Sequence, residues 1–168
     1  MSENYKILDD GTIVREDYFF SQVKGEGAQI LPFQRKVWKI YLLTLVTFGI
    51  YGIIIGFSMA KETNIACAGD GKHTRGFWAV IGFSLITFGI YAIVWYVGWL
   101  NRESDFLKSK GNDEYFSGWT YLLLVALQLI PIPILPLLLG IYSLTKIVRQ
   151  HNAVNATYNE LNNFVQKI

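Results

Sequence analysis

The strongest constraint on this chain is an internal repeat with a period of 40 residues. A shift of 40 places Trp38 on Trp78, and it places the T-F-G-I-Y block that begins at Thr47 on an identical block that begins at Thr87. Such self-similarity at a fixed period indicates that one structural unit is built twice. Each copy lies in an apolar run long enough for a transmembrane helix, because about 20 apolar residues rising 1.5 Å each cross the ~30 Å hydrocarbon layer.

Composition favours the same environment. The chain of 168 residues is 52% hydrophobic and 17% charged, against a usual charged share of about 25%. Three stretches, residues 40–60, 77–100 and 118–145, contain no Asp, Glu, Lys, Arg or His. These features predict a membrane protein. The formal net charge of +2, without a run of basic residues, predicts no nucleic-acid partner.

The predicted fold class is therefore an all-α integral membrane protein with about three transmembrane helices, the third broken by proline. The predicted parts are a soluble N-terminal arm over residues 1–36, spans at about 37–60, 77–100 and 118–148 within a membrane domain (37–148), and an amphipathic C-terminal helix over 149–168. In the third block, Pro131, Pro133 and Pro136 interrupt a regular helix. This block either crosses as one broken helix or dips in and returns as a hairpin.

The two ends of the chain carry weaker patterns. Residues 5–8 and 12–15 predict two short strands about the D-G turn at Asp10 and Gly11, forming a β-hairpin arm. A lone hairpin is marginal in water, so it should rest on another part of the chain or on a partner. In the tail, apolar residues follow steps of four and three and predict a helix seam, with His151 as a packing residue on it.

The distribution of basic residues does not decide the topology. With three crossings, the Lys and Arg residues near the spans divide almost equally, which is no bias. Six lie on one side (Arg35, Lys36, Lys39, Arg102, Lys108 and Lys110) and five on the other (Lys61, Lys72, Arg75, Lys146 and Arg149). A near tie also follows if the spans are re-entrant hairpins and every polar segment faces the cytoplasm. Both topologies stay open at this point.

The doubled T-F-G-I-Y block resembles a family of small bacterial multi-pass membrane proteins known only as a domain of unknown function. The matching features here are the two blocks, the polar exit at Glu62 and Asn64, and a G-D-G-K loop from Gly69 to Lys72. The resemblance implies a multi-pass protein of the bacterial cytoplasmic membrane. It carries over no activity.

The repeated block is the candidate mid-membrane motif. If each span crosses once, the two copies are antiparallel and their Thr and Tyr side chains face one another, as at transporter substrate sites. The alternative is that the Thr hydroxyls bond back one turn and the Gly residues permit close helix crossing. The candidate residues are Thr47, Gly49, Tyr51, Thr87, Gly89 and Tyr91, and a ridge of small residues for helix packing is formed by Gly52, Gly56 and Ala60.

No constellation of residues indicates catalysis. His73 and His151 are the only histidines, and Cys67 is the only cysteine, so no catalytic residue, metal site or cofactor is expected. The chain is expected to be a non-catalytic membrane protein that acts through protein contacts, as a scaffold or an accessory subunit. The alternative is a small oligomeric transporter or channel for a neutral substrate. Expected partners are the lipid bilayer and a second copy or membrane protein bound through the C-terminal helix.

Overall fold

The computed structural model describes residues 5–7, 13–15, 30–162 and 164–166. The helices over this part are α2 (Val37–Val46), α3 (Ile50–Ala66), the 3-10 helix η1 (Ala68–Asp70), α4 (Phe77–Ile86), α5 (Ile90–Ser109), α6 (Gly118–Leu127) and α7 (Leu135–Leu161). Three short strands, β1 (Tyr5–Ile7), β2 (Ile13–Arg15) and β3 (Val165–Gln166), complete the described elements.

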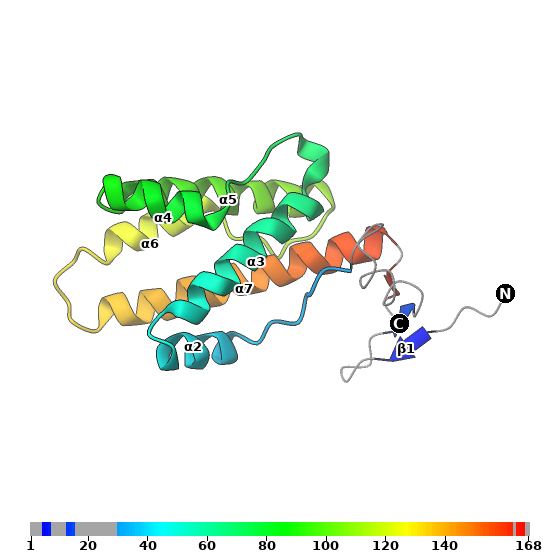
Figure 1. The fold of residues 1–168 in the computed structure, drawn as a ribbon, viewed down its shortest axis with the longest axis horizontal. Coiled ribbons are helices and arrows are strands. Elements are labelled where there is room, and N and C mark those ends of the chain that lie inside the picture. Colours follow the sequence, from blue (N-terminus) through cyan, green and yellow to red (C-terminus); the bar gives the residue numbers. More distant parts are fainter. Residues whose placement is uncertain (1–4, 8–12, 16–29, 163, 167–168) are drawn as a thin grey trace.

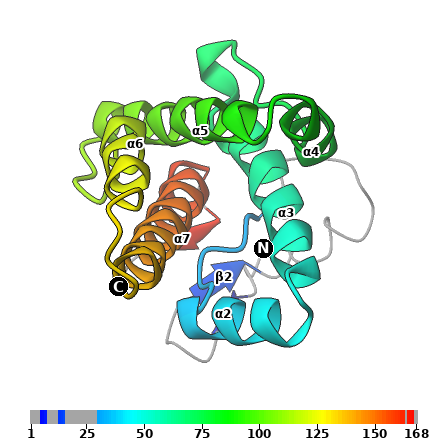
Figure 2. The same cartoon turned by 90° about the vertical axis from the view of Figure 1, so that its left-hand side faces the viewer.

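The helices form three helical hairpins, α2–α3, α4–α5 and α6–α7. In each hairpin a helix of 10 residues is followed by a longer one of 17, 20 or 27 residues. The turns of all three hairpins lie at one end of the molecule, on the left of Figure 1, and the loops between hairpins lie toward the other end. Figure 2 looks onto the end with the turns. The hairpin is thus the unit that the sequence repeats.

The predicted membrane-spanning fold is wrong. Among the described helices, none combines the length and the apolar character that a membrane crossing requires. The runs predicted as spans 37–60 and 77–100 each reverse direction at their centre, and 118–148 reverses at its prolines. The length of an apolar run is the same for a straight helix and for a hairpin, so length alone could not separate them. The predicted separate helix over 149–168 is also absent, because α7 continues from the third block to Leu161.

The first reversal is produced by the T-F-G-I-Y block. Phe48 and Gly49 both have positive φ, at 49° and 92°, which ends α2 and turns the chain. The Gly49 N–H donates to the Thr44 carbonyl at 2.7 Å, as in the glycine motif that commonly ends helices. The Thr47 hydroxyl donates to the Leu43 carbonyl at 2.7 Å and accepts from the Tyr51 N–H at 2.9 Å. One threonine therefore ties the end of α2 to the start of α3.

The second copy makes the same turn 40 residues later. Phe88 and Gly89 have φ of 51° and 87°. The Gly89 N–H donates to the Ser84 carbonyl at 2.8 Å. The Thr87 hydroxyl donates to a carbonyl one turn earlier at 2.8 Å and accepts from the Tyr91 N–H at 3.0 Å. The repeated block is thus the sequence of a helix–turn–helix reversal whose polar groups bond within the turn.

The third reversal uses proline instead. The connection between α6 and α7 contains Pro131 and Pro133, and Pro136 lies in the first turn of α7, where its missing N–H is not needed. Of the two forms left open for this block, the hairpin is the one that the structure has.

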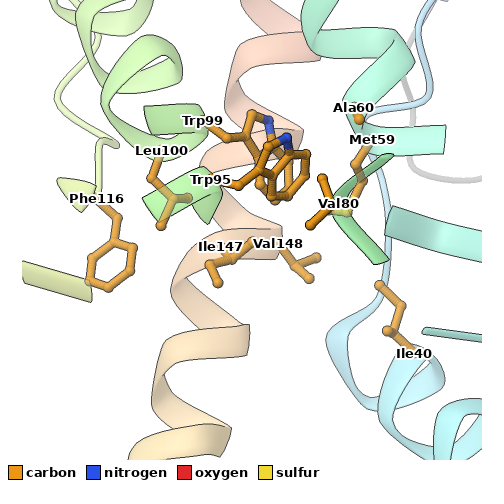
Figure 3. Close-up of a cluster of buried hydrophobic side chains, with 10 residues drawn as sticks. All are labelled: Ile40, Met59, Ala60, Val80, Trp95, Trp99, Leu100, Phe116, Ile147 and Val148. Carbon is orange, nitrogen blue, oxygen red and sulfur yellow. The ribbon is translucent and has the colours of Figure 1, made fainter. Parts of the chain in front are cut away.

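A core between the hairpins holds them together. Trp95, Trp99 and Leu100 from α5 pack against Ile147 and Val148 from α7 (Figure 3). The indoles of Trp95 and Trp99 lie 5.2 Å apart between their ring centroids. Gly118 at the start of α6 lets this helix approach α5 closely, because a Cβ at Gly118 would lie 2.2 Å from the Val97 carbonyl oxygen. Ile40 of α2 and Met59 of α3 belong to the same core, so it joins elements from all three hairpins.

The strands form a three-stranded sheet in the order β1-β2-β3. Tyr5 pairs with Arg15 between antiparallel β1 and β2, and Val14 of β2 pairs with Val165 of β3. The predicted hairpin arm is thus not a separate unit but part of a three-stranded sheet, because the C-terminal end of the chain supplies the third strand. The predicted D-G turn lies outside the described residues.

Candidate functional site

Three longer helices bring Glu62 (α3), Glu103 (α5) and His151 (α7) together inside the protein. His151 is fully buried, and its Nδ1 lies 2.7 Å from Glu103 Oε1 while its Nε2 lies 2.9 Å from Glu62 Oε2. The sequence placed His151 on a packing seam but did not predict its two carboxylate partners. They lie 48 and 89 residues away in the chain, so no local spacing could have indicated them.

Glu62 is the most connected member of this group. Arg35 binds its two oxygens in a bidentate pair, with N–O distances of 2.6 and 2.8 Å. The Ser58 hydroxyl donates to Oε1 at 2.5 Å, and the Asn155 amide donates to Oε2 at 2.7 Å. Bidentate arginine pairs fix geometry as well as charge. Glu62 therefore connects α7 to the segment that precedes α2.

Glu103 is completely buried and receives hydrogen bonds from α3 and α7. The Thr63 hydroxyl donates to its Oε1 at 2.7 Å, and the Gln150 amide donates to its Oε2 at 3.2 Å. The Trp99 indole N–H in turn donates to the Thr63 hydroxyl at 2.7 Å. We call Arg35, Glu62, Glu103 and His151 the charged network. With His151 protonated it holds two positive and two negative charges.

Electrostatics favours that protonated state. Burial alone lowers the pKa of His151, but the adjacent Glu103 and Glu62 carboxylates outweigh it and raise this pKa above its ordinary value. Burial likewise acts to raise the pKa of Glu62, yet hydrogen bonds from His151 and Arg35 lower that pKa to about 2. Both ring nitrogens of His151 are occupied by carboxylates. The arrangement has the chemistry of a buried ion-pair network that joins helices.

A second arginine organises the loop between the first two hairpins. Arg102 is buried and binds both carboxylate oxygens of Asp70, at 2.7 and 2.9 Å, and the carbonyl of Lys72 at 2.6 Å. The G-D-G-K residues are thus held from α5. Cys67, at the end of α3, is buried, and this burial together with the nearby Glu103 charge raises the pKa of its thiol to about 12. In the described part of the chain, no group of three or more His, Cys, Asp or Glu is placed to hold a metal ion.

Asparagine side chains join consecutive hairpins. In each case an asparagine in the polar half of a long helix binds the main chain at the start of a short helix or just before it. The three pairs are Asn64 with Thr74 before α4, Asn101 with Gly118 at the start of α6, and Asn152 with Arg35 before α2. The last pair links the third hairpin to the first, so the three hairpins form a closed ring.

The predicted mid-membrane motif lies at the hairpin turns. Thr47 and Thr87 each bond within their own turn, and Tyr91 also accepts a hydrogen bond from Arg75 at 3.2 Å. Of the small-residue ridge, Gly52 lies against Thr44 of α2, because a Cβ added at Gly52 would lie 3.1 Å from Thr44 Cγ2. Ala60 is buried in the core, whereas Gly56 is half-buried. These residues pack within the chain itself.

The turns carry large apolar side chains that point away from the protein. Phe48 and Phe88 are 97% and 96% exposed. We call this surface the apolar end. It consists of Leu45, Val46, Phe48, Ile50, Leu85, Ile86, Phe88, Ile90, Leu129, Ile130, Ile132, Ile134 and Leu137, which are all exposed. Monomeric proteins in water rarely leave so extended an apolar patch uncovered.

Comparison with known protein families assigns the chain. The model of a family described as Domain of unknown function (DUF4234) matches residues 35–76 and 75–156, which together cover more than half of the chain. The chain belongs to the DUF4234 family. The first DUF4234 match covers the α2–α3 hairpin, and the second covers the α4–α5 hairpin and the α6–α7 hairpin up to residue 156. No curated protein and no solved structure matches the chain. Membership confirms the expected family of unknown function, and it does not establish a multi-pass membrane protein.

Proposed function

We propose that this chain is a non-catalytic protein of the bacterial cytoplasmic membrane, seated in one leaflet by its three helical hairpins. It acts by presenting its other end to protein partners. We call this end, which contains the charged network and the loops between hairpins, the polar end. The observation that carries this proposal is the apolar end itself. Three turns with exposed apolar side chains lie at the same end of the molecule. A lipid leaflet covers such a surface without a second protein.

Dimensions support a seat in one leaflet. The short helices α2, α4 and α6 have 10 residues each, which is about 15 Å at 1.5 Å per residue. This length is half of the ~30 Å hydrocarbon layer. Hairpins of this depth would place their turns near the middle of the bilayer.

Exposed tryptophans lie at the other end of the short helices, where the headgroup level of the membrane would be. Trp38, Trp78 and Trp119 are each the second residue of their short helix, and all three are exposed. Tryptophan concentrates at the level of lipid headgroups, where its ring is half in apolar surroundings. Phe48 and Phe88 follow the first two of these tryptophans by ten residues. Headgroup-level side chains and midplane side chains would thus be separated by one leaflet.

Charge placement points to the same side of the membrane for all loops. The charge-free stretches 40–60, 77–100 and 118–145 each contain one hairpin turn, so the basic residues of the loops gather toward the opposite end. Cytoplasmic loops carry an excess of Lys and Arg. A hairpin topology therefore turns the six-against-five tie of a three-span topology into a one-sided distribution.

The backbone hydrogen bonds of the turns also suit the hydrocarbon interior of a bilayer. An unpaired backbone group in lipid costs several kcal/mol, in the range of about 2–7. In the first turn the N–H groups of residues 47–51 all donate hydrogen bonds within the hairpin. We do not favour the transporter alternative, because the Thr47 and Thr87 hydroxyls are engaged inside their own turns.

Single-cysteine labelling in intact cells tests the proposal. In a Cys67→Ala background, Lys72→Cys and Asp113→Cys place thiols in the first and second inter-hairpin loops, both exposed. We expect a membrane-impermeant maleimide to label both only after permeabilisation. Phe48→Cys at the turn should stay unlabelled in both conditions. Labelling of the two loops from opposite sides, or aqueous labelling of residue 48 on either side, would overturn the one-leaflet seat.

A further inference from the structure

The segment of residues 30–36, which we call the strap, lies beside α7 on its way into α2 (Figure 1). Two asparagines of α7 hold its main chain in the same manner. Asn159 accepts from the Leu31 N–H at 2.9 Å and donates to the Leu31 carbonyl at 2.7 Å. Asn152 accepts from the Arg35 N–H at 3.2 Å and donates to the Arg35 carbonyl at 3.0 Å. Each asparagine thus binds both polar main-chain groups of one residue.

A third asparagine between these two completes the row. Asn155 donates to the Pro32 carbonyl at 2.7 Å. Its own Oδ1 is buried and has no hydrogen-bond partner, and Pro32 has no N–H to supply one. Asn152, Asn155 and Asn159 follow helical spacing, so they line one face of α7. This face binds an extended main chain through side-chain amides and does not depend on the side chains of the strap.

Two side chains of the strap add selectivity. Leu31 is buried against Ala66, Cys67, Leu107 and Val154. Arg35 forms the bidentate pair with Glu62, which belongs to the charged network. Main-chain hydrogen bonds with pockets for particular side chains are the general means of recognising an extended peptide. Here the pockets accept an apolar residue and an arginine four positions later.

We propose that this row of asparagines and its two pockets form an exchangeable peptide site, and that the strap of a second copy of the chain occupies it in place of the chain's own strap. The occupant is fixed by the sequence that fits. The strap of every copy carries Leu31, Pro32 and Arg35 in the spacing that the site binds. Lys36, the last residue of the strap before α2, has an extended backbone at φ −83° and ψ 117°. Rearrangement at such a connection is the usual route to exchange of an element between copies.

Two full-length variants separate exchange from binding within one chain. Arg35→Ala weakens the strap and leaves the asparagine row intact, whereas Asn159→Ala weakens the site and leaves the strap intact. In a mixture, the strap of the Asn159→Ala copy can occupy the site of the Arg35→Ala copy. In detergent, we expect a tagged copy of one variant to capture about ten times more of the other variant than of untagged protein of its own kind. Tenfold is the effect of losing one strong contact.

A labelled peptide with the sequence of residues 30–36 is the second probe. We expect saturable binding to the full-length Arg35→Ala protein, measured by fluorescence anisotropy. This binding should weaken about tenfold when Asn159→Ala is added to the protein or when glutamine replaces arginine in the peptide. A scrambled peptide of the same composition is the control. If Arg35→Ala does not fold, Arg35→Lys serves instead, because lysine keeps the charge but cannot form the bidentate pair.

Each outcome bears on the proposal. Excess capture in the mixture together with sequence-dependent peptide binding supports the exchange. Peptide binding without excess capture overturns it, since the site would then bind a strap only from its own chain or a free peptide. Absence of both, in variants that keep the helical circular dichroism and cooperative melting of the parent, overturns the peptide site altogether. These outcomes do not depend on the depth of membrane insertion, so they are distinct from the labelling test above.

Discussion

Each end of this molecule departs from the usual distribution of side chains in a protein: one end exposes apolar side chains, and the other buries ionisable ones. At the apolar end, Phe48 and Phe88 are almost fully exposed, while at the polar end Glu103 and His151 are completely buried. The apolar end is stabilised by local turns, and each turn forms its hydrogen bonds within one hairpin. The polar end is stabilised by contacts between hairpins, such as that of His151 with Glu62. Substitutions at the two ends should therefore affect different properties.

The largest effect is expected from Glu62→Ala at the polar end. The change removes both oxygens that pair with Arg35 and one of the two carboxylates that contact His151. Removal of one partner from a buried ion pair costs about 3–5 kcal/mol, because the remaining charge is left unpaired. The measurement is the free energy of unfolding in detergent. Asp113→Ala, at an exposed carboxylate, is the matched control and should change it by less than about 0.5 kcal/mol. Equal losses in the two variants would contradict the network as the source of stability.

Phe48→Asp is expected to show the opposite pattern at the apolar end. Because this side chain makes few contacts with the protein, the free energy of unfolding in detergent should hardly change. Membrane association should weaken, since an aspartate near the bilayer centre costs about 2.5–3.5 kcal/mol. The measurement is the fraction bound in a vesicle flotation assay. Phe48→Leu should bind like the parent. If Asp at this position bound equally well, the turn would not lie in lipid.

A smaller effect on stability is expected at the turn itself, from Gly49→Ala. Gly49 has φ of 92°, and an added Cβ would meet nothing within 4 Å, so only the backbone conformation opposes the change. A non-glycine residue in the left-handed region costs about 1–2 kcal/mol. Gly82→Ala is the control, because Gly82 lies inside α4 with open space around it. This control should gain about 0.5–1 kcal/mol. Destabilisation of both variants to the same extent would show that the turn conformation is not what matters.

The sequence predicted the repeated unit but left its topology open between crossing spans and re-entrant hairpins. The 40-residue period and the apolar lengths were evident, yet two consecutive left-handed residues at Phe48 and Gly49 were not, because a bulky residue such as Phe rarely adopts positive φ. The proline-rich block left a hairpin open as one of two forms. For the first two blocks the predicted spans were wrong, since the T-F-G-I-Y block was interpreted as the interior of a helix.

The charged network was beyond sequence reasoning for a different reason. Its members come from the segment before α2 and from α3, α5 and α7, and they meet only after the three hairpins have packed. The asparagines of α7 belong to its polar face, and the sequence did not predict what covers that face. Asn155 and Asn159 are in fact fully buried, because they bind the main chain of the strap. Burial of a polar helix face needs a partner that the helix sequence does not contain.

The free energy of unfolding should depend on pH through the charged network, and this is the smallest of the four expected effects. The pKa of His151 is raised on folding, so its contribution is complete below the unfolded value of about 6.5 and is lost as pH rises through the folded pKa. The pKa of Glu62 is lowered from 4.5 to about 2, so its contribution is present above 4.5 and is lost as pH falls toward 2. Stability should therefore be greatest between these limits. Each group can contribute at most about 1.4 kcal/mol per pH unit.

Denaturant unfolding in detergent across this pH range measures the two losses. The alkaline loss should disappear in His151→Gln, which has no charge to lose, although the variant should be less stable throughout. It should persist in His73→Gln, because His73 is exposed in the first inter-hairpin loop. If the alkaline loss followed His73 instead, the buried histidine would not carry a positive charge in the folded protein. The polar end would then be held by neutral hydrogen bonds, and the contrast between its buried charges and the uncharged apolar end would be lost.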